Sequence, residues 1–500
     1  MKRAITPFVL AAAAGLAGCA GMKPGLGFDD AGGVRQSVVE RTGMKVHWNN
    51  GTKEDAEVAA AVANLLARNL TADAAVQTAL LNNHDLQAVY EELNLSQAEM
   101  VQAGLLRNPI LSGEIRWATT GGEGPAVVLD LTQDFVSLLY MPLRKGQAEA
   151  AFEAAKLRVT AAVVDTASEV RSAFYEYQAA EQAREMRKTV LDATLASYDL
   201  AQRLRAAGNN RELDVLNEQD ASEQARLDLA RAEENVTQLR ERLNALMGLW
   251  GKQTQWHAEA MLPALPTDDG VPADLERAAI ESNLELGVAR REIEVAARAL
   301  GITKPFGWLT DAEAGVAAER ELEGTWSVGP SLSLPVPLFD QGQGAVGKAQ
   351  ARLRQASEHF YARAVEVRSR VRAAHSVVMS ARDRANYYHR VVLPLRHQIV
   401  DQTQLQYNAM QVSAFQLLEA KRNQIEAGAN YIEALRDYWV ARTKLEQVLS
   451  GRLTAFEGPG ASSPDAGRNS GAAKMRAVRT STGTTEAGLL PRPNNEEVTP

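Results

Sequence analysis

The chain has 500 residues, of which 45% are hydrophobic and 23% are charged, a composition typical of a folded protein. Its 62 acidic and 54 basic residues give a formal net charge of −8, which argues against nucleic acid as the main partner. No apolar run reaches the roughly 18 to 20 residues of a membrane-spanning helix, so any membrane-spanning part would consist of strands. The single cysteine excludes an intrachain disulfide and a cysteine-based zinc site.

The N-terminus predicts an export signal over residues 1–18, because two basic residues precede an apolar stretch that ends in small residues. The junction Leu16–Cys19 resembles the bacterial lipobox, which implies that Cys19 is acylated and becomes the mature N-terminus. The alternative is an ordinary signal peptide with an incidental cysteine. Acyl chains on Cys19 would anchor the protein in a membrane. Ala20 after the cysteine points to the outer membrane, and residues 19–60 are predicted to form a Gly-rich, polar tether.

The sequence repeats itself with an offset of about 200 residues. Ala79–Leu86 resembles Ala279–Leu286, and Gly208–Leu216 aligns with Met410–Leu418. Nearly constant offsets over such a distance indicate a duplication. The predicted organisation is a first repeat (61–250), an equatorial linker (251–274), a second repeat (275–452) and a disordered C-terminal tail (453–500) rich in Gly, Ser, Pro and Thr.

Each repeat is expected to contain a pair of short strands. Apolar residues alternate with polar ones in the four segments 109–118, 126–135, 311–320 and 325–338. Such alternation gives a strand one apolar and one polar face, as in a strand that contacts lipid outside and water inside. A soluble sheet packed on a core is the alternative explanation for any single strand.

Long helices make up the larger part of the predicted fold. Apolar residues recur at steps of three and four, as in a coiled coil, and residues 147–204 contain neither Pro nor Gly. Pro394 is expected to bend the later long helix. The four long helices are predicted over residues 147–204, 213–249, 345–405 and 415–450.

The expected strands constrain the assembly. A strand edge cannot stay unpaired in lipid, so a sheet that spans a membrane has to close on itself. Four strands per chain are too few, and two chains would give eight strands, whose interior is filled by side chains. Three chains would give twelve strands and an open lumen.

The order of these parts resembles the outer-membrane efflux family, the TolC-like channels. The residues that carry the resemblance are Arg107–Ser112, which enter the first strand, Leu332–Asp340, which leave the last, and the two helical breaks. The resemblance covers about residues 60–452. It implies a mostly α fold with a small β part, in which a duplicated helix-strand-strand-helix-helix repeat builds a helical periplasmic tunnel. The strands of three chains would form a twelve-stranded outer-membrane β-barrel.

The resemblance also implies a function and partners. A homotrimer would be the exit duct of a tripartite export pump, docked to a periplasmic adaptor protein and an inner-membrane pump, and would pass small molecules or ions. The two helical breaks correspond to the periplasmic tip, where the adaptor contact candidates are Arg205, Gly208, Asn209, Met410 and Gln411. The family usually has Gly at the position of Met410.

The pore constriction of the family carries acidic residues just after the second tip. The corresponding gate candidates are Gln416 and Glu419, together with Asp214 in the first repeat. A ring of three Glu419 carboxylates would favour cations. The alternative is that Glu419 is an ordinary solvated helix residue.

Other function classes have weaker support. Gly342–Gly347 fits the dinucleotide fingerprint, but Pro335 and Pro337 in the preceding strand argue against a central parallel strand. The seven scattered histidines have no metal-binding spacing, and no nucleophile-and-base set is evident, so neither a metal, a cofactor nor an enzyme activity is expected. A structural coiled-coil lipoprotein without a pore is the main alternative. The second tip faintly resembles members of the family that are linked to heavy metals.

Overall fold

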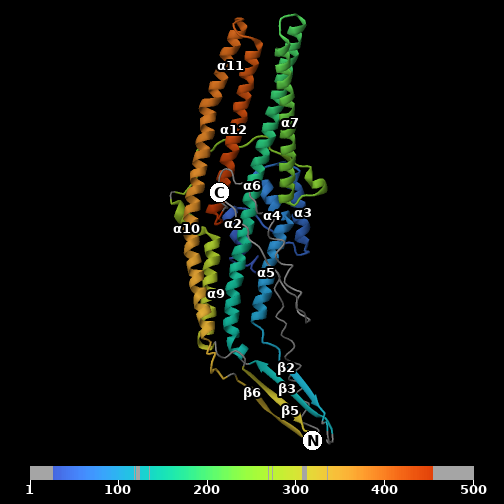
Figure 1. Cartoon of the computed structure of the whole chain (residues 1–500), viewed down its shortest axis with the longest axis vertical. Coiled ribbons are helices and arrows are strands. Elements are labelled where there is room, and N and C mark those ends of the chain that lie inside the picture. Colours follow the sequence, from blue (N-terminus) through green and yellow to red (C-terminus); the bar gives the residue numbers. More distant parts are fainter. Residues whose placement is uncertain are drawn as a thin grey trace, which may run out of the picture. The chain divides into compact units, whose positions relative to one another are not determined.

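We analysed a computed structural model of the chain, which describes residues 26–117, 119, 124–134, 136–268, 270–272, 274–306, 312–334 and 336–453. The predicted signal (1–18), Cys19 and all but the first residue of the predicted tail (453–500) therefore lie outside the described residues. Residues 26–453 belong to one compact unit. Figure 1 shows this unit as long helices that run side by side, with a small sheet at one end.

The element order confirms the predicted mostly helical, duplicated fold. The first repeat contains α4 (Ala72–Asn82), α5 (His84–Ala103), β2 (Ile110–Arg116), β3 (Ala126–Asp134), α6 (Val136–Ala206) and α7 (Glu212–Met247). The second repeat contains α8 (Leu275–Ser282), α9 (Leu284–Phe306), β5 (Glu313–Arg320), β6 (Trp326–Ser333), α10 (Gln343–Tyr387), α11 (Leu393–Asn408) and α12 (Ala414–Leu449). No helix in the described ranges is apolar enough over a sufficient length to cross a bilayer.

The duplication extends to the helix caps. Asn83 and Asn283 each begin a helix with nearly the same backbone angles, and each side chain accepts a hydrogen bond from the amide three residues later. Asn is among the residues that best satisfy a free amide at a helix start. Gly248 and Gly451, which follow α7 and α12, both adopt positive φ angles and pack against these asparagine turns. The two repeats therefore use the same local solution at corresponding positions.

The predicted tether over residues 19–60 is wrong for the part that the structure describes. This part contains α2 (Val34–Thr42) and the start of α3 (Lys53–Leu66), which also crosses the predicted boundary at residue 61. Phe28 and Trp48 are buried, and both rings contact Tyr90 of α5, with ring centroids 4.9 Å and 6.3 Å away from that of Tyr90. Burial of aromatic side chains so distant in sequence holds this segment in the core.

Two of the predicted long helices differ substantially from the observed elements, while the other two agree within two residues. α6 begins at Val136, eleven residues earlier than predicted, and has Pro142 in its first two turns. The predicted helix over 345–405 is interrupted by a π-helix, η3 (Tyr388–Val392), directly before α11. Pro394 lies in the first turn of α11, where its missing amide costs least. The predicted interruption near Pro394 is thus a local change of helix type.

The four main strands form one antiparallel sheet in the order β2-β3-β5-β6. They have 7, 9, 8 and 8 residues, so all are shorter than the predicted segments. β6 ends at Ser333 because its partner, Glu313, is the first residue of β5. Since β2 and β3 precede α6 while β5 and β6 precede α10, the sheet joins the two repeats.

The linker between the repeats is held against both of them. It contains a 3-10 turn, η2 (Gly251–Thr254), and β4 (His257–Ala258), which pairs in parallel with β1 (Asn69–Leu70). Arg240 of α7 donates to the carbonyls of Thr254 and Trp256, and its guanidinium lies 4.4 Å from the Trp256 ring. Further along, Arg382 of α10 donates to the carbonyls of Pro266 and Thr267. The linker is therefore a belt bound to α7 and α10.

Candidate functional site

The sheet has one face that is almost entirely apolar. The strand register places Leu111 opposite Leu131, Leu131 opposite Val316, and Val316 opposite Pro330. The large apolar side chains of this face have 41% to 71% of their surface exposed: Leu111, Ile115, Trp117, Leu129, Leu131, Val316, Trp326, Val328 and Leu332. Water would solvate these side chains poorly, so this face requires an apolar surrounding that a single chain does not supply.

The opposite face is polar. It carries Ser112, Asp130, Glu319 and Ser331, and Ser331 donates a hydrogen bond of 3.0 Å to Asp130 across the intervening strand. Gly315 lies between them, and a side chain there would meet the Leu131 carbonyl at 2.3 Å. The alternation predicted from the sequence is therefore present in all four strands, with polar groups collected on one side.

The sheet is open at both sides. Among the described residues, β2 and β6 each pair with one strand only, so each has an edge of unpaired amides and carbonyls. An exposed edge of this kind can pair with another chain. Neighbouring strands of the sheet are antiparallel, so its first strand, β2, and its fourth strand, β6, run in opposite directions. β6 of one copy can therefore pair antiparallel with β2 of the next copy.

The first helical tip joins α6 to α7. Gly208 adopts a φ of 76°, and the Asn209 amide donates to the Leu204 carbonyl, so the turn closes as a left-handed helix end. Arg205 forms an ion pair of 2.8 Å with Glu212 across the turn. Asp214 accepts from the Arg211 amide and contacts the Arg211 guanidinium, and so caps α7. The gate candidate Asp214 therefore has a structural role in the chain itself.

The second tip joins α11 to α12 in the same manner, 202 residues later. Met410 occupies the position of Gly208 with a φ of 60°, and is the sole described non-glycine residue with a positive φ. The Gln411 amide donates to the Gln406 carbonyl. The Met410 side chain is 94% exposed. The second tip thus keeps the turn geometry of the first tip without a glycine, at the cost of backbone strain.

The other two gate candidates begin α12. Gln416 accepts from the Ser413 amide at 3.0 Å and its own amide donates to the Ser413 hydroxyl, which completes a capping box. Glu419 is exposed and forms an ion pair with Arg422, and it accepts from Asn423. The negative charge of Glu419 is therefore partly offset within its own helix.

The structure does not bring the two sets of tip residues together in one chain. Among the described residues, no hydrogen bond or ion pair joins the tip of α6 and α7 to the tip of α11 and α12, which Figure 1 shows as two separate hairpins. Asp214 and Glu419 therefore lie in separate hairpins of the chain.

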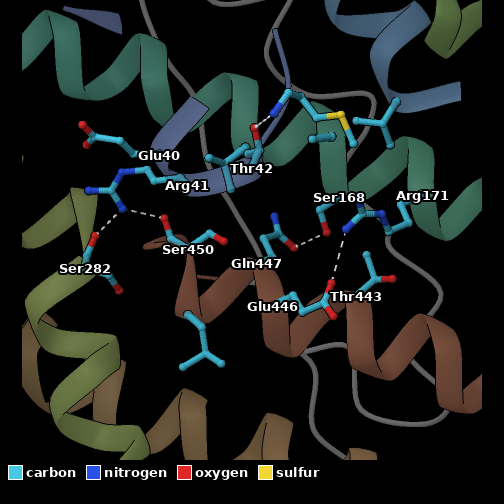
Figure 2. A pocket seen from close by; sticks show the side chains of 15 residues that line it. Glu40, Arg41, Thr42, Ser168, Arg171, Ser282, Thr443, Glu446, Gln447 and Ser450 are labelled. Carbon is cyan, nitrogen blue, oxygen red and sulfur yellow. Dashed lines mark hydrogen bonds and ion pairs between the residues drawn. The ribbon is translucent and has the colours of Figure 1, made fainter. Parts of the chain in front are cut away.

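A cavity of about 520 Å³ lies where the repeats meet at the equator. Figure 2 shows Arg41 of α2 directed at Ser282 and Ser450. One Arg41 nitrogen donates to both of these carbonyls at 2.7 Å, at the ends of α8 and α12. A cation is favourable at a helix C-terminus, although burial lowers the pKa of Arg41. Arg41 therefore holds the N-terminal segment to the second repeat.

Charged side chains around this cavity form a paired network. Arg452 binds Asp165 of α6 at 2.5 Å and Glu285 of α9 at 2.7 Å, and its hydrogen bonds to Asp165 raise the pKa of the guanidinium. Arg171 bridges Asp73 and Glu446. These pairs satisfy the charges and connect the repeats, so the cavity is a structural junction. Sequence reasoning missed Arg41 and Arg452 because their partners are remote backbone carbonyls and carboxylates.

The signals for other chemistry have structural explanations. Gly342 begins α10 with a φ of 80°, and the strand before it, β6, lies at the edge of an antiparallel sheet. A dinucleotide fingerprint requires a parallel βαβ unit, so this alternative is contradicted. In the described part of the chain, no three His, Cys, Asp or Glu side chains are grouped closely enough to hold a metal ion.

Comparison with known proteins places this arrangement in a family context. Residues 75–249 match the family model described as outer membrane efflux protein. The cobalt-zinc-cadmium resistance protein CzcC of Cupriavidus metallidurans is 22% identical over 386 residues, which cover 76% of this chain and 90% of CzcC. The Campylobacter jejuni CmeC outer membrane channel superposes with a TM-score of 0.64 at 14% identity, over 76% of this chain and 85% of CmeC.

A second channel structure has the same fold. The open state of the Neisseria gonorrhoeae MtrE outer membrane channel superposes with a TM-score of 0.61 at 16% identity, over 75% of this chain and 88% of MtrE. The similarity to CmeC and MtrE therefore extends over both repeats and not only over the residues that match the family model.

The strain at Met410 leads to a prediction. Replacing Met410 by Gly should stabilise the second tip by about 1 kcal/mol, because a non-glycine residue in the left-handed region is unfavourable by about that amount. The lost side chain is exposed, so no packing is lost with it. Hydrogen exchange of the amides around residues 405–416, followed by mass spectrometry, should slow roughly fivefold. The matched variant Gly208→Met should speed exchange at the first tip; equal exchange in all three proteins would contradict the assigned strain.

Proposed function

We propose that this chain, whose residues 75–249 match the outer membrane efflux protein family model, is the exit duct of a tripartite export pump. In this proposal three copies form a channel through the outer membrane, which receives cargo from an inner-membrane pump through a periplasmic adaptor protein. The matched family is one of efflux proteins and not of enzymes, and we propose that the chain has no catalytic residue of its own.

The exposed apolar face of the sheet is the observation that carries the proposal. Leaving its large side chains in water would be unfavourable by on the order of 10 kcal/mol per chain. Lipid around the outside of the sheet removes this penalty, while the face with Asp130 and Ser331 lines an aqueous interior. The rival function, a coiled-coil lipoprotein without a pore, gives no role to such a face.

The two open edges support closure of the sheet by further copies. In lipid, the unpaired backbone groups of β2 and β6 have no water to bind, so the sheet has to be closed by other chains. Three sheets of four strands give a closed barrel of twelve, wide enough for a lumen. The coiled helices below the sheet extend this lumen as a tunnel.

A matched pair of variants tests the lipid-facing assignment. Val328 and Ser327 are exposed neighbours on β6, but they lie on the apolar and the polar face respectively. Val328→Arg should impair insertion and lower conductance in planar bilayers, because the cost of a cation on the lipid face depends on depth and reaches roughly 2 to 4 kcal/mol at the midplane. Ser327→Arg should insert and conduct. The channel would be disproved if the wild-type protein stayed monomeric in mild detergent and did not conduct in planar bilayers.

For the cargo, we propose divalent transition-metal ions. Support comes from the similarity to CzcC, which is named for resistance to cobalt, zinc and cadmium and is covered over 90% of its length. A second support is the acidic residue after each tip, Asp214 and Glu419, which three copies would present as rings. Gln416, which caps α12, would lie one turn before the Glu419 ring.

The ion pair between Glu419 and Arg422 gives the gate prediction a matched control. Glu419→Gln should leave Arg422 unopposed and shift the reversal potential in a zinc chloride gradient towards the value for anion-selective conduction. Arg422→Gln should free the Glu419 carboxylate and shift the reversal potential towards the value for cation-selective conduction. Unchanged reversal potentials in both variants would exclude Glu419 from the constriction. Both side chains are exposed in the chain, so the variants should fold.

The tips are proposed to contact the adaptor. The residues in question are those predicted from the sequence, Arg205, Gly208, Asn209, Met410 and Gln411, and they form the two turns at the far end of the helices from the sheet. Two tips of similar shape in each chain would give a trimer six docking positions. The proposal that both tips contact the adaptor is supported by the similar geometry of their turns, at Gly208 and at Met410.

We further propose that Cys19 carries the lipid anchor, and the fold is compatible with it. Gly27 lies against Phe152, which is sixteen residues, or about 24 Å, along α6 from its start at the sheet. Gly27 is eight residues after Cys19, and eight residue-to-residue steps can span at most about 28 Å. The anchor can therefore reach the level at which the sheet begins. Cys19→Ser should lose mass-spectrometric evidence of acylation and the membrane attachment of the unassembled chain; an unmodified Cys19 would refute this.

A further inference from the structure

The second hairpin carries a row of polar residues that neither the sheet nor the tips account for. His397, Asp401, Gln404 and Asn408 follow one another at steps of four, three and four residues along α11, so they lie on one face of the helix. The Gln404 side chain donates a hydrogen bond of 3.1 Å to Asn408, so these two are direct neighbours. Each of the four side chains has a nitrogen or oxygen atom with a lone pair, and the row contains neither Lys nor Arg. These residue types can bind a cation.

His397 and Asp401 are spaced like two ligands of one metal ion. His397 Nε2 lies 3.6 Å from Asp401 Oδ2, which is too long for an ordinary hydrogen bond. Zinc binds histidine nitrogens and carboxylate oxygens at about 2.0 to 2.2 Å, so two ligands of a tetrahedral ion lie about 3.3 to 3.6 Å apart. The two atoms therefore already have a separation that a tetrahedral metal ion can bridge.

Gln424 of α12 holds the other side of the His397 ring. Its side-chain amide forms a hydrogen bond of 3.1 Å with His397 Nδ1. When Nε2 of a histidine binds a metal ion, Nδ1 carries the proton, and a carbonyl group that accepts this proton fixes the orientation of the ring. An amide side chain has such a carbonyl group as well as a donor. Gln424 can therefore satisfy Nδ1 with and without a bound ion, and it leaves Nε2 available beside Asp401.

Both side chains are open to solvent. His397 is 67% exposed and Asp401 is 58% exposed, so an ion can reach both atoms without displacing a packed side chain. Two protein ligands leave the remaining positions of a tetrahedral ion to water. In the parts of the chain that the structure describes, no third His, Cys, Asp or Glu is close enough to complete the shell. Such an incomplete shell favours weak binding and fast release, which suits an ion that has to move on.

The pair lies further from the second tip than Glu419. His397 is level with Gln424 on α12, and Gln424 is five residues, or about 7.5 Å, further along the helix than Glu419. The π-helix η3 ends at Val392, five residues before His397. A π-helical turn adds a residue and so rotates the helix that follows it, and such turns are frequent at functional sites. The pair thus lies between Glu419 and a local change of helix type.

We propose that His397 and Asp401 bind a divalent transition-metal ion, with Gln424 as the positioning residue that orients the imidazole. The inference rests on the proposed function, because the bound ion would be the proposed cargo at a point beyond Glu419. An imidazole nitrogen favours zinc, cobalt and similar ions over magnesium, which prefers oxygen ligands. An ordinary ion pair on the surface of α11 is the other explanation, and it predicts no such preference.

Zinc binding by four variants of the full-length protein tests the site. Zinc chloride is titrated into the purified protein in the presence of excess magnesium chloride, and the affinity is measured by calorimetry. His397→Gln and Asp401→Asn each remove a ligand, and Gln424→Leu removes the positioning contact. His389→Gln is the matched control, because His389 is an exposed histidine eight residues earlier whose ring contacts Tyr431 of α12, with ring centroids 5.8 Å apart.

We expect His397→Gln and Asp401→Asn to weaken zinc binding at least tenfold and Gln424→Leu to weaken it roughly tenfold, since even the outer contacts of a metal site contribute that much. His389→Gln should bind zinc like the parent protein. In a second measurement, copper(II) bound to the parent protein should give an electron spin echo modulated by the remote nitrogen of an imidazole, and this modulation should weaken in His397→Gln. Equal zinc affinity in His397→Gln and the parent protein, equal losses in His397→Gln and His389→Gln, or displacement of zinc by magnesium would overturn the site.

Conductance separates this inference from the proposed function. The same preparations are inserted into planar bilayers in potassium chloride. Conducting parent protein whose zinc binding does not depend on His397 would refute the site and leave the exit duct intact. Parent protein that binds zinc through His397 but does not conduct would support the site and refute the duct.

Discussion

An apolar sheet face beside two unpaired strand edges is the feature on which the rest of the molecule depends. In water, the face that contains Leu131 and Val316 would favour aggregation, and in lipid the edges of β2 and β6 would be the larger problem. In the proposed channel, closure by further copies would solve both, since it would pair the edges and leave the apolar face to the lipid. Assembly would then be a condition for a stable sheet and not an addition to it.

The duplication provides a nearly symmetric frame, and the differences between the repeats indicate where function has diverged. Asn83 and Asn283 keep the same cap, which belongs to the equator, where both repeats need rigid helix starts. The tips differ, because Gly208 closes one turn without strain and Met410 closes the other with strain. Among the described helices, the π-helical segment occurs in the second repeat alone, between the belt contact of Arg382 and the tip. The strained turn and the altered helix type therefore both lie in the second repeat, next to and at the hairpin of α11 and α12.

Most of the fold could be predicted from local sequence patterns, whereas contacts between residues distant in sequence could not be predicted. The alternation of apolar and polar residues in β2, β3, β5 and β6 and the repeated turn at Gly208 depend on neighbouring residues, so both could be predicted from the sequence alone. The predicted tether is wrong because the composition of this segment is polar on average, whereas its burial depends on contacts of Phe28 and Trp48 with the remote Tyr90. In the candidate site, the positions of the tips could be predicted from the sequence. The ion pair of Glu419 could not, since it depends on the conformation of both side chains.

The charge pattern along the helices suggests why selectivity would be decided at the tips. At the equator, charged groups such as Arg452 and Asp165 are paired and partly buried, so they contribute to the junction between repeats and little to the field in a lumen. At the tips, the carboxylates of Asp214 and Glu419 are near the ends of their helices, and each faces one arginine. Exposed pairs of this kind are weak and can exchange partners. The proposed threefold assembly would repeat each pair around one axis. Small changes in the positions of these side chains would then alter the net field at the proposed constriction, whereas the paired charges at the equator would stay unchanged.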